Sequence, residues 1–283
     1  MDTTQDLSSS DSILQKFASV IENPKKVEPG VKLYTGVDLG TAYLVLAVID
    51  EEGNPVAGAM QFAQVVKDGL VVDYLGAVDI VRGLKVELEE KLGRVLDLAA
   101  VAFPPGTGKG DARTIRNVAE AAGFEVIAEI DEPTAANAVL GITDGAVVDI
   151  GGGTTGTAII QAGKVVNVSD DPTGGTHFSL VIAGAFKISF EEAEDRKKSP
   201  QGRTEVIHLL RPVMEKVAFI INNHLKEYSV EAVYLAGGTS CLEGIENVVS
   251  QIVGVPVLKP ANPFLVTPLG IAMYCRAGSA SNE

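Results

Sequence analysis

The sequence lacks tryptophan, and among its 283 residues it has two cysteines and three histidines. Cys241 and Cys275 stand alone, without a CxxC pair, and His177, His208 and His224 do not have the spacing of metal ligands. A disulfide framework or a zinc site would need tighter groups of these residues. The sequence therefore predicts neither, and it indicates a reducing compartment.

Basic residues are scarce, and long apolar runs are missing. Lys and Arg number 23 against 37 Asp and Glu, a net charge of −14. Nucleic acids and anionic membranes attract basic surfaces, so we expect neither as a partner. Charges, Gly and Pro interrupt every apolar stretch before it reaches the length of a membrane span. The N-terminus lacks the basic and apolar regions of a secretion signal, and we therefore expect a cytoplasmic protein.

What the sequence does contain is a repeated segment. One apolar strand ends in Asp38 and leads into Leu39-Gly40-Thr41, and a later one ends in Asp149 and leads into Ile150-Gly151-Gly152-Gly153-Thr154. A glycine-rich turn lets backbone N–H groups approach a phosphate closely, and a carboxylate at a strand end suits Mg²⁺. An ordinary hairpin corner or a flexible turn is the alternative for either segment alone. Because both occur with similar flanks, we expect two hairpins that hold a nucleotide between them.

The apolar pattern divides the chain into three parts. Residues 1–30 predict an amphipathic helix and a linker, with apolar residues at helical spacing: Ile13, Leu14, Phe17, Ala18 and Ile21. This helix either packs on its own lobe or serves as a docking arm for a larger assembly. Residues 31–142 predict a first lobe and residues 143–261 a second. A helix within 262–283 is expected to return to the first lobe and complete it.

Strands alternate with helices in both lobes. We expect a helix from about Leu75 to Leu92, a buried strand from Leu98 to Phe103, a helix from Asp111 to Ala121 and helical structure between Thr173 and Tyr228. Gly106 to Gly110 lacks the spacing of a Walker motif, so it predicts a loop before a helix. The core residues are mainly Val, Ile, Leu and Ala, as in parallel strands covered by helices. The chain therefore predicts an α/β fold with a mostly parallel sheet in each lobe.

Five segments, in order, resemble the ATPase superfamily shared by actin, heat-shock chaperones and sugar kinases. They are Gly36 to Tyr43, Asp131 to Ala136, Asp149 to Thr154, Ala236 to Ser240 and Pro268 to Met273. The resemblance covers nearly everything after Tyr34. It implies an actin-like ATPase fold, in which two duplicated ribonuclease H-like lobes with minimal subdomain insertions enclose a nucleotide cleft.

Within that superfamily, the small size and two segments most resemble the EutJ family, chaperone-like proteins of bacterial ethanolamine utilisation. The segments are Lys187 to Glu194 and Thr267 to Met273. This resemblance implies ATP, ADP and Mg²⁺ as ligands, and a client protein that is assisted or reactivated. An ethanolamine-degrading enzyme or a component of a bacterial microcompartment is the candidate client.

The resemblance also implies a role for each candidate site residue. Asp38 and Asp149 would hold Mg²⁺ through water, and Glu132 would position the attacking water, although a plain helix cap is the alternative for Glu132. The phosphate-binding residues would be Gly40, Thr41, Ala42, Tyr43, Gly151, Gly152, Gly153 and Thr154. The adenosine-binding residues would be Glu194, Lys197, Gly237, Gly238 and Thr239. For Glu194 and Lys197, which share a helix face, a solvated surface pair is the alternative.

The sequence departs from the chaperone pattern in two places. Thr155-Gly156 stands where the chaperones carry Phe-Asp, and Cys241 lies nearest to the place of an Arg that stacks on adenine. The first lobe also lacks room for the subdomain that supplies a Lys to the phosphates. We therefore expect a weak Mg-dependent ATPase or nucleotide binding without much catalysis. The alternatives are a nonenzymatic, nucleotide-switched scaffold of the actin-like or pilus-assembly type and, less favoured, a small-molecule kinase.

Overall fold

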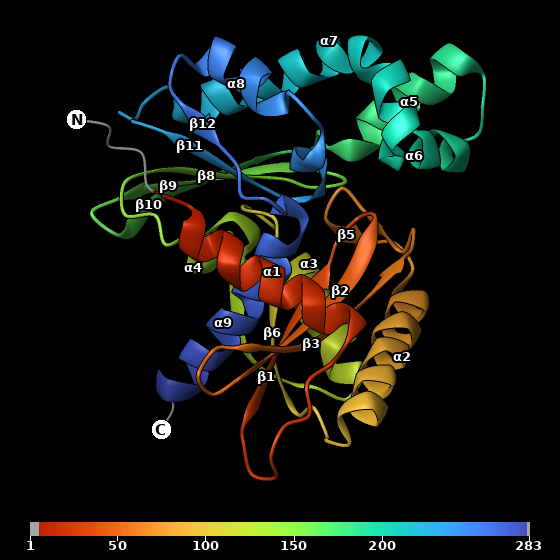
Figure 1. Ribbon diagram of the computed structural model, residues 1–283, viewed down its shortest axis with the longest axis vertical. Helices are drawn as coiled ribbons and strands as arrows, with labels where there is room; N and C mark the ends of the chain where they lie inside the picture. Colours follow the sequence, from red (N-terminus) through yellow and green to blue (C-terminus); the bar gives the residue numbers. More distant parts are fainter. Residues whose placement is uncertain (1–5, 282–283) are drawn as a thin grey trace.

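The computed structural model describes residues 6–281, which form two five-stranded sheets and a small two-stranded one (Figure 1). The first large sheet has the strand order β3-β2-β1-β6-β7. Its strands are β1 (Leu33–Leu39), β2 (Tyr43–Asp50), β3 (Pro55–Phe62), β6 (Leu98–Phe103) and β7 (Glu125–Asp131). β2 runs antiparallel to both of its neighbours, whereas β1, β6 and β7 are parallel.

The second sheet repeats this arrangement in the order β10-β9-β8-β11-β12. Its strands are β8 (Gly145–Ile150), β9 (Thr155–Gln161), β10 (Lys164–Asp171), β11 (Val233–Ala236) and β12 (Val257–Leu258). β9 is antiparallel to both neighbours, and β8, β11 and β12 are parallel. The prediction of an α/β fold with two duplicated lobes is confirmed. The expected mostly parallel sheets are instead mixed, because each lobe begins with two antiparallel pairings.

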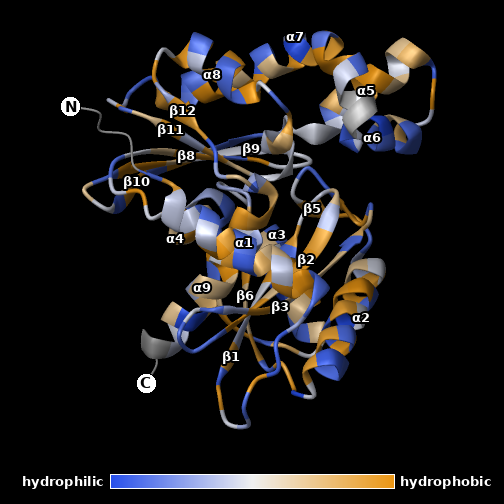
Figure 2. Ribbon diagram, viewed as in Figure 1, coloured by the Kyte–Doolittle hydropathy of each residue, from blue (hydrophilic) through white to orange (hydrophobic). Residues whose placement is uncertain are grey.

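Helices cover both faces of each sheet. The outer face of the first sheet packs on α2 (Tyr74–Leu92) and α3 (Lys109–Ala121), and the second on α5 (Gly175–Phe186), α7 (Pro200–Leu225) and α8 (Ile245–Val253). The helix α6 (Phe190–Lys198) packs against α5 and α7. Between the sheets lie α4 (Glu132–Leu140) and α9 (Val266–Ser281). Hydrophilic and hydrophobic residues alternate along the outer helices α2 and α7 (Figure 2), as expected for helices with one face in the core.

The two central helices cross where a glycine removes a side chain. A Cβ atom on Gly270 of α9 would collide with the carbonyl oxygen of Ala135 in α4. Only glycine therefore permits this separation of the two backbones. The helix α9 also packs along β1 and β2 of the first sheet.

Local signals set the ends of two helices beside the cleft. Asp73 accepts a hydrogen bond from the backbone N–H of Gly76 at 2.9 Å, and Asp131 accepts one from Thr134 at 2.9 Å, so both aspartates cap helix N-termini. Left-handed glycines end the same helices, Gly93 for α2 and Gly141 for α4. The cap at Asp131 fixes the start of α4, and therefore the position of Glu132.

Four further short elements complete the fold. The strands β4 (Val66–Lys67) and β5 (Leu70–Val71) form a hairpin between β3 and α2, and the 3₁₀ helices are η1 (Gly238–Cys241) and η2 (Pro263–Leu265). The predicted strand from Leu98 to Phe103 is β6, and the helix expected from Leu75 is α2. The loop predicted over Gly106 to Gly110 is shorter than expected, because α3 begins at Lys109.

The N-terminal helix α1 (Ser8–Glu22) packs on the chain itself. Its buried face includes Leu14, Phe17 and Val20, and a Cβ atom on Gly58 of β3 would lie 2.8 Å from the Phe17 ring. The Ser10 hydroxyl donates to the carbonyl oxygen of Val139 in α4 at 3.0 Å. This arrangement favours the first of the two expectations for the helix. Residues 1–5 and 282–283 of the predicted arm and C-terminal helix lie outside the described residues, and the boundaries at 31–142 and 143–261 stay a prediction.

Candidate nucleotide cleft

One cavity of about 770 Å³ opens between the two sheets. This volume falls in the range of small-molecule sites. Every candidate site residue from the sequence lines it: Asp38, Gly40, Thr41, Ala42, Tyr43, Glu132, Asp149, Gly151, Gly152, Gly153, Thr154, Glu194, Lys197, Gly237, Gly238 and Thr239. The structure therefore brings the whole predicted set together, while the role of each residue stays a prediction.

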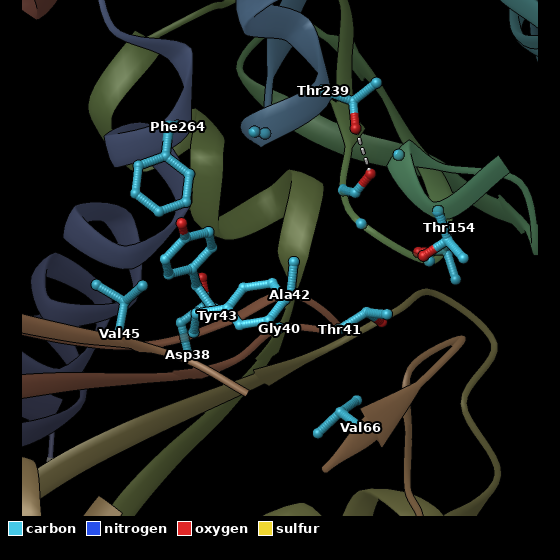
Figure 3. A pocket seen from close by; sticks show the side chains of 18 of the residues that line it. Asp38, Gly40, Thr41, Ala42, Tyr43, Val45, Val66, Thr154, Thr239 and Phe264 are labelled. Carbon is cyan, nitrogen blue, oxygen red and sulfur yellow. Dashed lines mark hydrogen bonds between the residues drawn. The ribbon is translucent and has the colours of Figure 1, made fainter. Parts of the chain in front are cut away.

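The two glycine-bearing turns meet at the floor of this cavity (Figure 3). A Cβ atom on Gly152 would lie 3.3 Å from the backbone nitrogen of Ala42, and one on Gly153 would lie 2.6 Å from the Thr41 hydroxyl oxygen. At Gly153 the backbone of Asp68 would also lie 2.8 Å away, so a side chain is excluded there, whereas at Gly152 it would be only tightly accommodated. The close approach of the two turns therefore accounts for the glycine at 153, favours the one at 152 and does not explain the one at 151.

The carbonyl groups of the second turn are held by hydrogen bonds. The oxygen of Gly151 accepts from the backbone N–H of Gly175 at 2.9 Å and from the hydroxyl of Thr239 at 2.7 Å, drawn in Figure 3. The oxygen of Gly152 accepts from the N–H of Thr176 at 2.8 Å. These bonds fix the orientation of the turn, because a rotated peptide would lose them.

Three acidic side chains, Asp38, Glu132 and Asp149, line the cavity and influence one another electrostatically. Burial raises the pKa of Asp38 to about 7, with a further contribution from the charge of Asp149. Burial raises the pKa of Asp149 to about 6, against a hydrogen bond from the hydroxyl of Thr267 that lowers it. The pKa of Glu132 is raised well above its usual value by burial and by the charges of Asp149 and Asp38. The site thus concentrates negative charge that a bound cation would stabilise.

The turn after β11 approaches one of these carboxylates. Gly237 has a φ of 85°, and a Cβ atom there would collide with Asp149 Oδ1. Glycine at this position therefore serves both the backbone angle and the packing of the acid. The ring of Phe264 lies next to Gly238, where a Cβ atom would be 3.2 Å from the ring.

Glu194 and Lys197 form a buried pair on α6. Their side chains are 6% and 12% exposed, and Lys197 Nζ lies 2.5 Å from Glu194 Oε1. Lys197 also donates to the carbonyl oxygen of Gly175 at 2.9 Å and to the hydroxyl of Ser179 at 2.8 Å. Burial raises the pKa of Glu194, but the charge and hydrogen bonds of Lys197 outweigh it, so the pKa is lowered overall. The alternative of a solvated surface pair is wrong, because the pair is buried between α6 and α5.

An aromatic and cationic contact crosses between the lobes beside this pair. Lys198 Nζ of α6 lies 4.9 Å from the ring centre of Tyr43 in β2 and 4.6 Å from that of Phe62 in β3. The Tyr43 ring also meets the rings of Phe62 and Phe264 at 5.6 and 5.4 Å, edge to face. These separations are within the range of cation–π and aromatic interactions. We call Lys198, Tyr43, Phe62 and Phe264 the cross-lobe cluster.

The sequence reasoning missed several residues that line the cavity. Phe62, Lys198 and Phe264 carry no motif and meet only in the folded chain. Lys67 of the β4–β5 hairpin also lines it, so a lysine of the first lobe reaches the cleft without the chaperone subdomain. The Asp68-Gly69 dipeptide is a turn signal that could have pointed to this hairpin. Cys241 also lines the cavity. The sequence analysis had placed this residue nearest to the position of the chaperone Arg that stacks on adenine.

No three His, Cys, Asp or Glu side chains within residues 6–281 gather as a ready-made metal site. A cation at Asp38 and Asp149 would therefore need water and phosphate oxygens as further ligands, which is how Mg²⁺ is commonly held. His224 instead bridges Thr157 and Asp171, at 2.9 and 3.0 Å. None of the helices in this same stretch is long and apolar enough to cross a membrane.

The two mixed sheets have the same strand order and lie on either side of the cavity. In each, the first strand of a hairpin ends in an aspartate that lines the cavity. This arrangement defines an actin-like ATPase fold. Solved structures agree. The structure of MreB 5 of Spiroplasma citri bound to AMPPNP superposes with a TM-score of 0.73 at 18% identity, covering 90% of this chain and 99% of that one. That of EutJ from Carboxydothermus hydrogenoformans superposes with a TM-score of 0.89 at 48% identity, covering 95% of this chain and 100% of that one.

Sequence comparison identifies the family within this fold. The chain is 44% identical to the ethanolamine utilization protein EutJ of Escherichia coli strain K12 over 85% of both chains, and it belongs to the EutJ family. The model of the Type IV pilus assembly protein PilM family matches residues 118–272. The chaperone protein HscA homolog of Vibrio parahaemolyticus is 26% identical over 82% of this chain, which spans 45% of that longer protein.

Proposed function

We propose that this protein is a Mg²⁺-dependent ATP-binding, slowly ATP-hydrolysing, chaperone-like protein of ethanolamine utilisation. One observation carries the proposal: two carboxylates and two glycine-bearing turns, one set from each lobe, line the same cavity. A nucleotide in this cavity would contact both lobes at once. The metabolic pathway in this proposal is inferred from the family, since the relatives are named ethanolamine utilization protein.

The residues present fit a magnesium nucleotide. Asp38 and Asp149 are both buried with raised pKa values, and the charge of Asp149 contributes to the rise at Asp38, so a cation bound by them would offset the cost of burying the two carboxylates. The backbone groups of Gly40 to Ala42 and Gly151 to Thr154 would bind phosphate oxygens. When bound, Mg²⁺ neutralises phosphate charge and so assists attack by water.

Each remaining residue then has a defined task. Glu132 stands at the first position of α4, fixed by the Asp131 cap, and would orient the attacking water and accept its proton. Glu194 and Lys197 would contact the ribose and base beside Gly237, Gly238 and Thr239. With glycine at 156 and cysteine at 241, we expect turnover to be slow.

A nucleotide that contacts both lobes would favour one angle between them. Binding ATP and releasing ADP would therefore change the surface offered to a client, as in other hinged proteins. We propose an ethanolamine-degrading enzyme or a microcompartment component as that client. The proposed compartment is the cytoplasm, with a bacterial microcompartment as the candidate site of association.

The test is a calorimetric titration of ATP and ADP with Mg²⁺ and with EDTA, together with phosphate release. We expect Asp149→Ala to abolish the Mg-dependent part of binding. Glu132→Ala should keep binding and lower hydrolysis by about 100-fold, the lower end of what a positioned acid or base contributes. Glu129→Ala, an exposed partner of Arg116 on the preceding strand, is the matched control. Absence of nucleotide binding by the wild type would refute the proposal.

A nonenzymatic scaffold is the second candidate. The PilM family match and the fold shared with MreB favour it, and it would use nucleotide only to set the conformation. ATP-dependent light scattering without phosphate release would support the scaffold. Substrate-dependent ATP consumption with small alcohols or acids would instead support the less favoured kinase.

A further inference from the structure

The turn that follows β11 forms part of the cavity wall. Its residues Gly237, Gly238, Thr239, Cys241 and Leu242 line the cavity, and the 3₁₀ helix η1 makes up the middle of the turn. In a helix of a single turn, most backbone groups have no partner inside the helix. Contacts with the surrounding chain must therefore determine where η1 lies.

The start of this turn is held by two hydrogen bonds. The backbone N–H of Gly237 donates to the carbonyl oxygen of Pro263 in η2 at 2.9 Å. The hydroxyl of Thr239 donates to the carbonyl oxygen of Gly151 at 2.7 Å (Figure 3). The first half of the turn is therefore bonded both to η2 and to the second glycine-bearing turn.

The end of the turn is held by the side chain of Lys259, which follows β12. Its Nζ donates to the carbonyl oxygen of Ser240 at 3.2 Å and to that of Leu242 at 3.0 Å, and it lies 2.7 Å from Glu246 Oε2 in the first turn of α8. An ammonium group has three protons, which match these three acceptors. Lysine side chains commonly bind the last carbonyl groups of a helix in this way.

Lys259 lies where it can act on the turn but not directly on a ligand. Neither Lys259 nor Glu246 lines the cavity, and their side chains are 22% and 27% exposed. The residues whose carbonyl groups Lys259 binds, Ser240 and Leu242, are both buried. A buried carbonyl that loses its partner costs free energy. Loss of the ammonium group should therefore favour a different path for the end of the turn.

Resting on the proposed function, we propose that Lys259 is a positioning residue for adenosine binding. It fixes the end of η1 through two carbonyl groups, and Glu246 fixes Lys259. The phosphate side of the cleft should not depend on this lysine, because the carbonyl oxygen of Gly151 keeps a second hydrogen bond, from the N–H of Gly175 at 2.9 Å. The proposal therefore separates the support of adenosine from the support of the magnesium ion and the phosphates.

The experiment is a calorimetric titration of ADP with Mg²⁺ and with EDTA, using variants of the full chain. Lys259→Met keeps most of the length of the side chain and removes the ammonium group. We expect ADP to bind about 10-fold more weakly in both conditions, the size of effect that a lost hydrogen bond to a charged group produces. The factor by which Mg²⁺ strengthens ADP binding should stay as in the wild type. A loss confined to the Mg²⁺ condition would overturn the proposal.

Three further variants test the arrangement around the lysine. Glu246→Gln should weaken ADP binding less than Lys259→Met, and the double variant should bind ADP as Lys259→Met does, because Glu246 acts through Lys259. Additive losses would overturn the proposal. Lys259→Arg, which keeps a cation with several N–H donors, should restore most of the affinity. Lys216→Met, at an exposed lysine of α7 in the same lobe, is the matched control.

A lysine that only stabilised the fold would give a different result. Lys259→Met would then melt at a lower temperature, while the folded protein, titrated well below its Tm, would bind ADP with wild-type affinity. In that case the positioning role is wrong and the proposed function stands. If the wild type binds no ADP, both proposals are wrong. Thermal melting of each variant, measured beside the titrations, shows that the protein titrated is folded.

Discussion

The strands β3 and β10 occupy equivalent edge positions in their sheets. Each lies next to the hairpin whose first strand ends in the acid, β1–β2 with Asp38 and β8–β9 with Asp149. Both contain a one-residue bulge, at Val56 and at Val166. The register then puts Met60 opposite Val45 in the first lobe and Asp170 opposite Gly156 in the second. Two matching backbones therefore present an apolar side chain in one lobe and a carboxylate in the other.

The two strands also differ in how much of them is buried. The first five residues of β3 are buried, under α1 and α2, whereas β10 leaves Val165, Val166 and Val168 exposed. The first lobe contributes the aromatic rings of Tyr43 and Phe62 to the cleft, and the second contributes Glu194, Lys197 and Thr154. The two duplicated lobes therefore share their backbone arrangement around the cavity but contribute side chains of different chemistry to it.

The largest expected effect concerns the covered strand. Phe17→Ala should lower the free energy of unfolding by about 3–5 kcal/mol, because the ring is fully buried against β3. Val165→Ala on the exposed β10 should change it by no more than about 0.5 kcal/mol. Denaturant titrations of both variants measure this difference. Equal losses would mean that β10 is covered in solution and that the comparison of the two strands fails.

The next effect compares the two acids. Asp149→Asn should weaken Mg-dependent ADP binding by about 100-fold, and Asp38→Asn by a similar factor if the lobes share the cation equally. Calorimetry with and without Mg²⁺ measures both. Asp144→Asn, on the loop before β8, serves as the control. A much smaller loss for Asp38→Asn would show that the second lobe alone holds the metal.

A smaller effect should appear in the pH dependence of stability. The folded protein keeps protons on Asp38 up to a pKa of about 7 and on Asp149 up to about 6, whereas an unfolded Asp loses its proton near its ordinary value of 3.8. The folded state therefore binds more protons between about pH 4 and 7, and this contribution to stability is lost as pH rises through that window. Asp38→Asn should flatten the fall of Tm between pH 5 and 8. An unchanged slope would show that Asp38 titrates normally.

The smallest effect concerns the cross-lobe cluster. Lys198→Ala removes the cation from the rings of Tyr43 and Phe62, a contact of about 0.5–1 kcal/mol at a partly exposed site. We expect ADP to dissociate about two- to five-fold faster, since such an energy corresponds to that change in rate. Stopped-flow displacement of a fluorescent ADP analogue measures it. Lys187→Ala at the end of α5 is the control, and an unaltered release rate for Lys198→Ala would show that the cluster does not restrain the nucleotide.

The sequence predicted the parts of the fold that depend on local pattern. The strand ends at Asp38 and Asp149 follow from apolar runs and from the glycines that come shortly after them, whereas the segment from Asp131 to Ala136 came from the family resemblance. The strands β1 and β8 therefore emerged from the sequence with the correct acids at their ends. Glu194 and Lys197 came from the family resemblance, and helical spacing placed them on one helix face, whereas their burial depends on Ser179 and Gly175 of another helix.

Asp170 could not be predicted in the same way. Its position opposite Gly156 depends on the bulge at Val166, and a shift of one residue would turn it to the other face of the sheet. Lys198 and Phe264 meet Tyr43 only because the lobes close on each other. Such residues lie far apart along the chain, and no short motif records their contact.

The placement of α1 has a mechanical consequence. Its Phe17 is held against β3, its Ser10 is bonded to α4 between the sheets, and its Asp11 accepts at 2.7 Å from the N–H of Ala261, on the segment that leaves the second sheet. Any swing of the second lobe about the first must stretch the Asp11–Ala261 bond or carry the helix with it. We therefore expect α1 to limit how far the two lobes can move relative to each other.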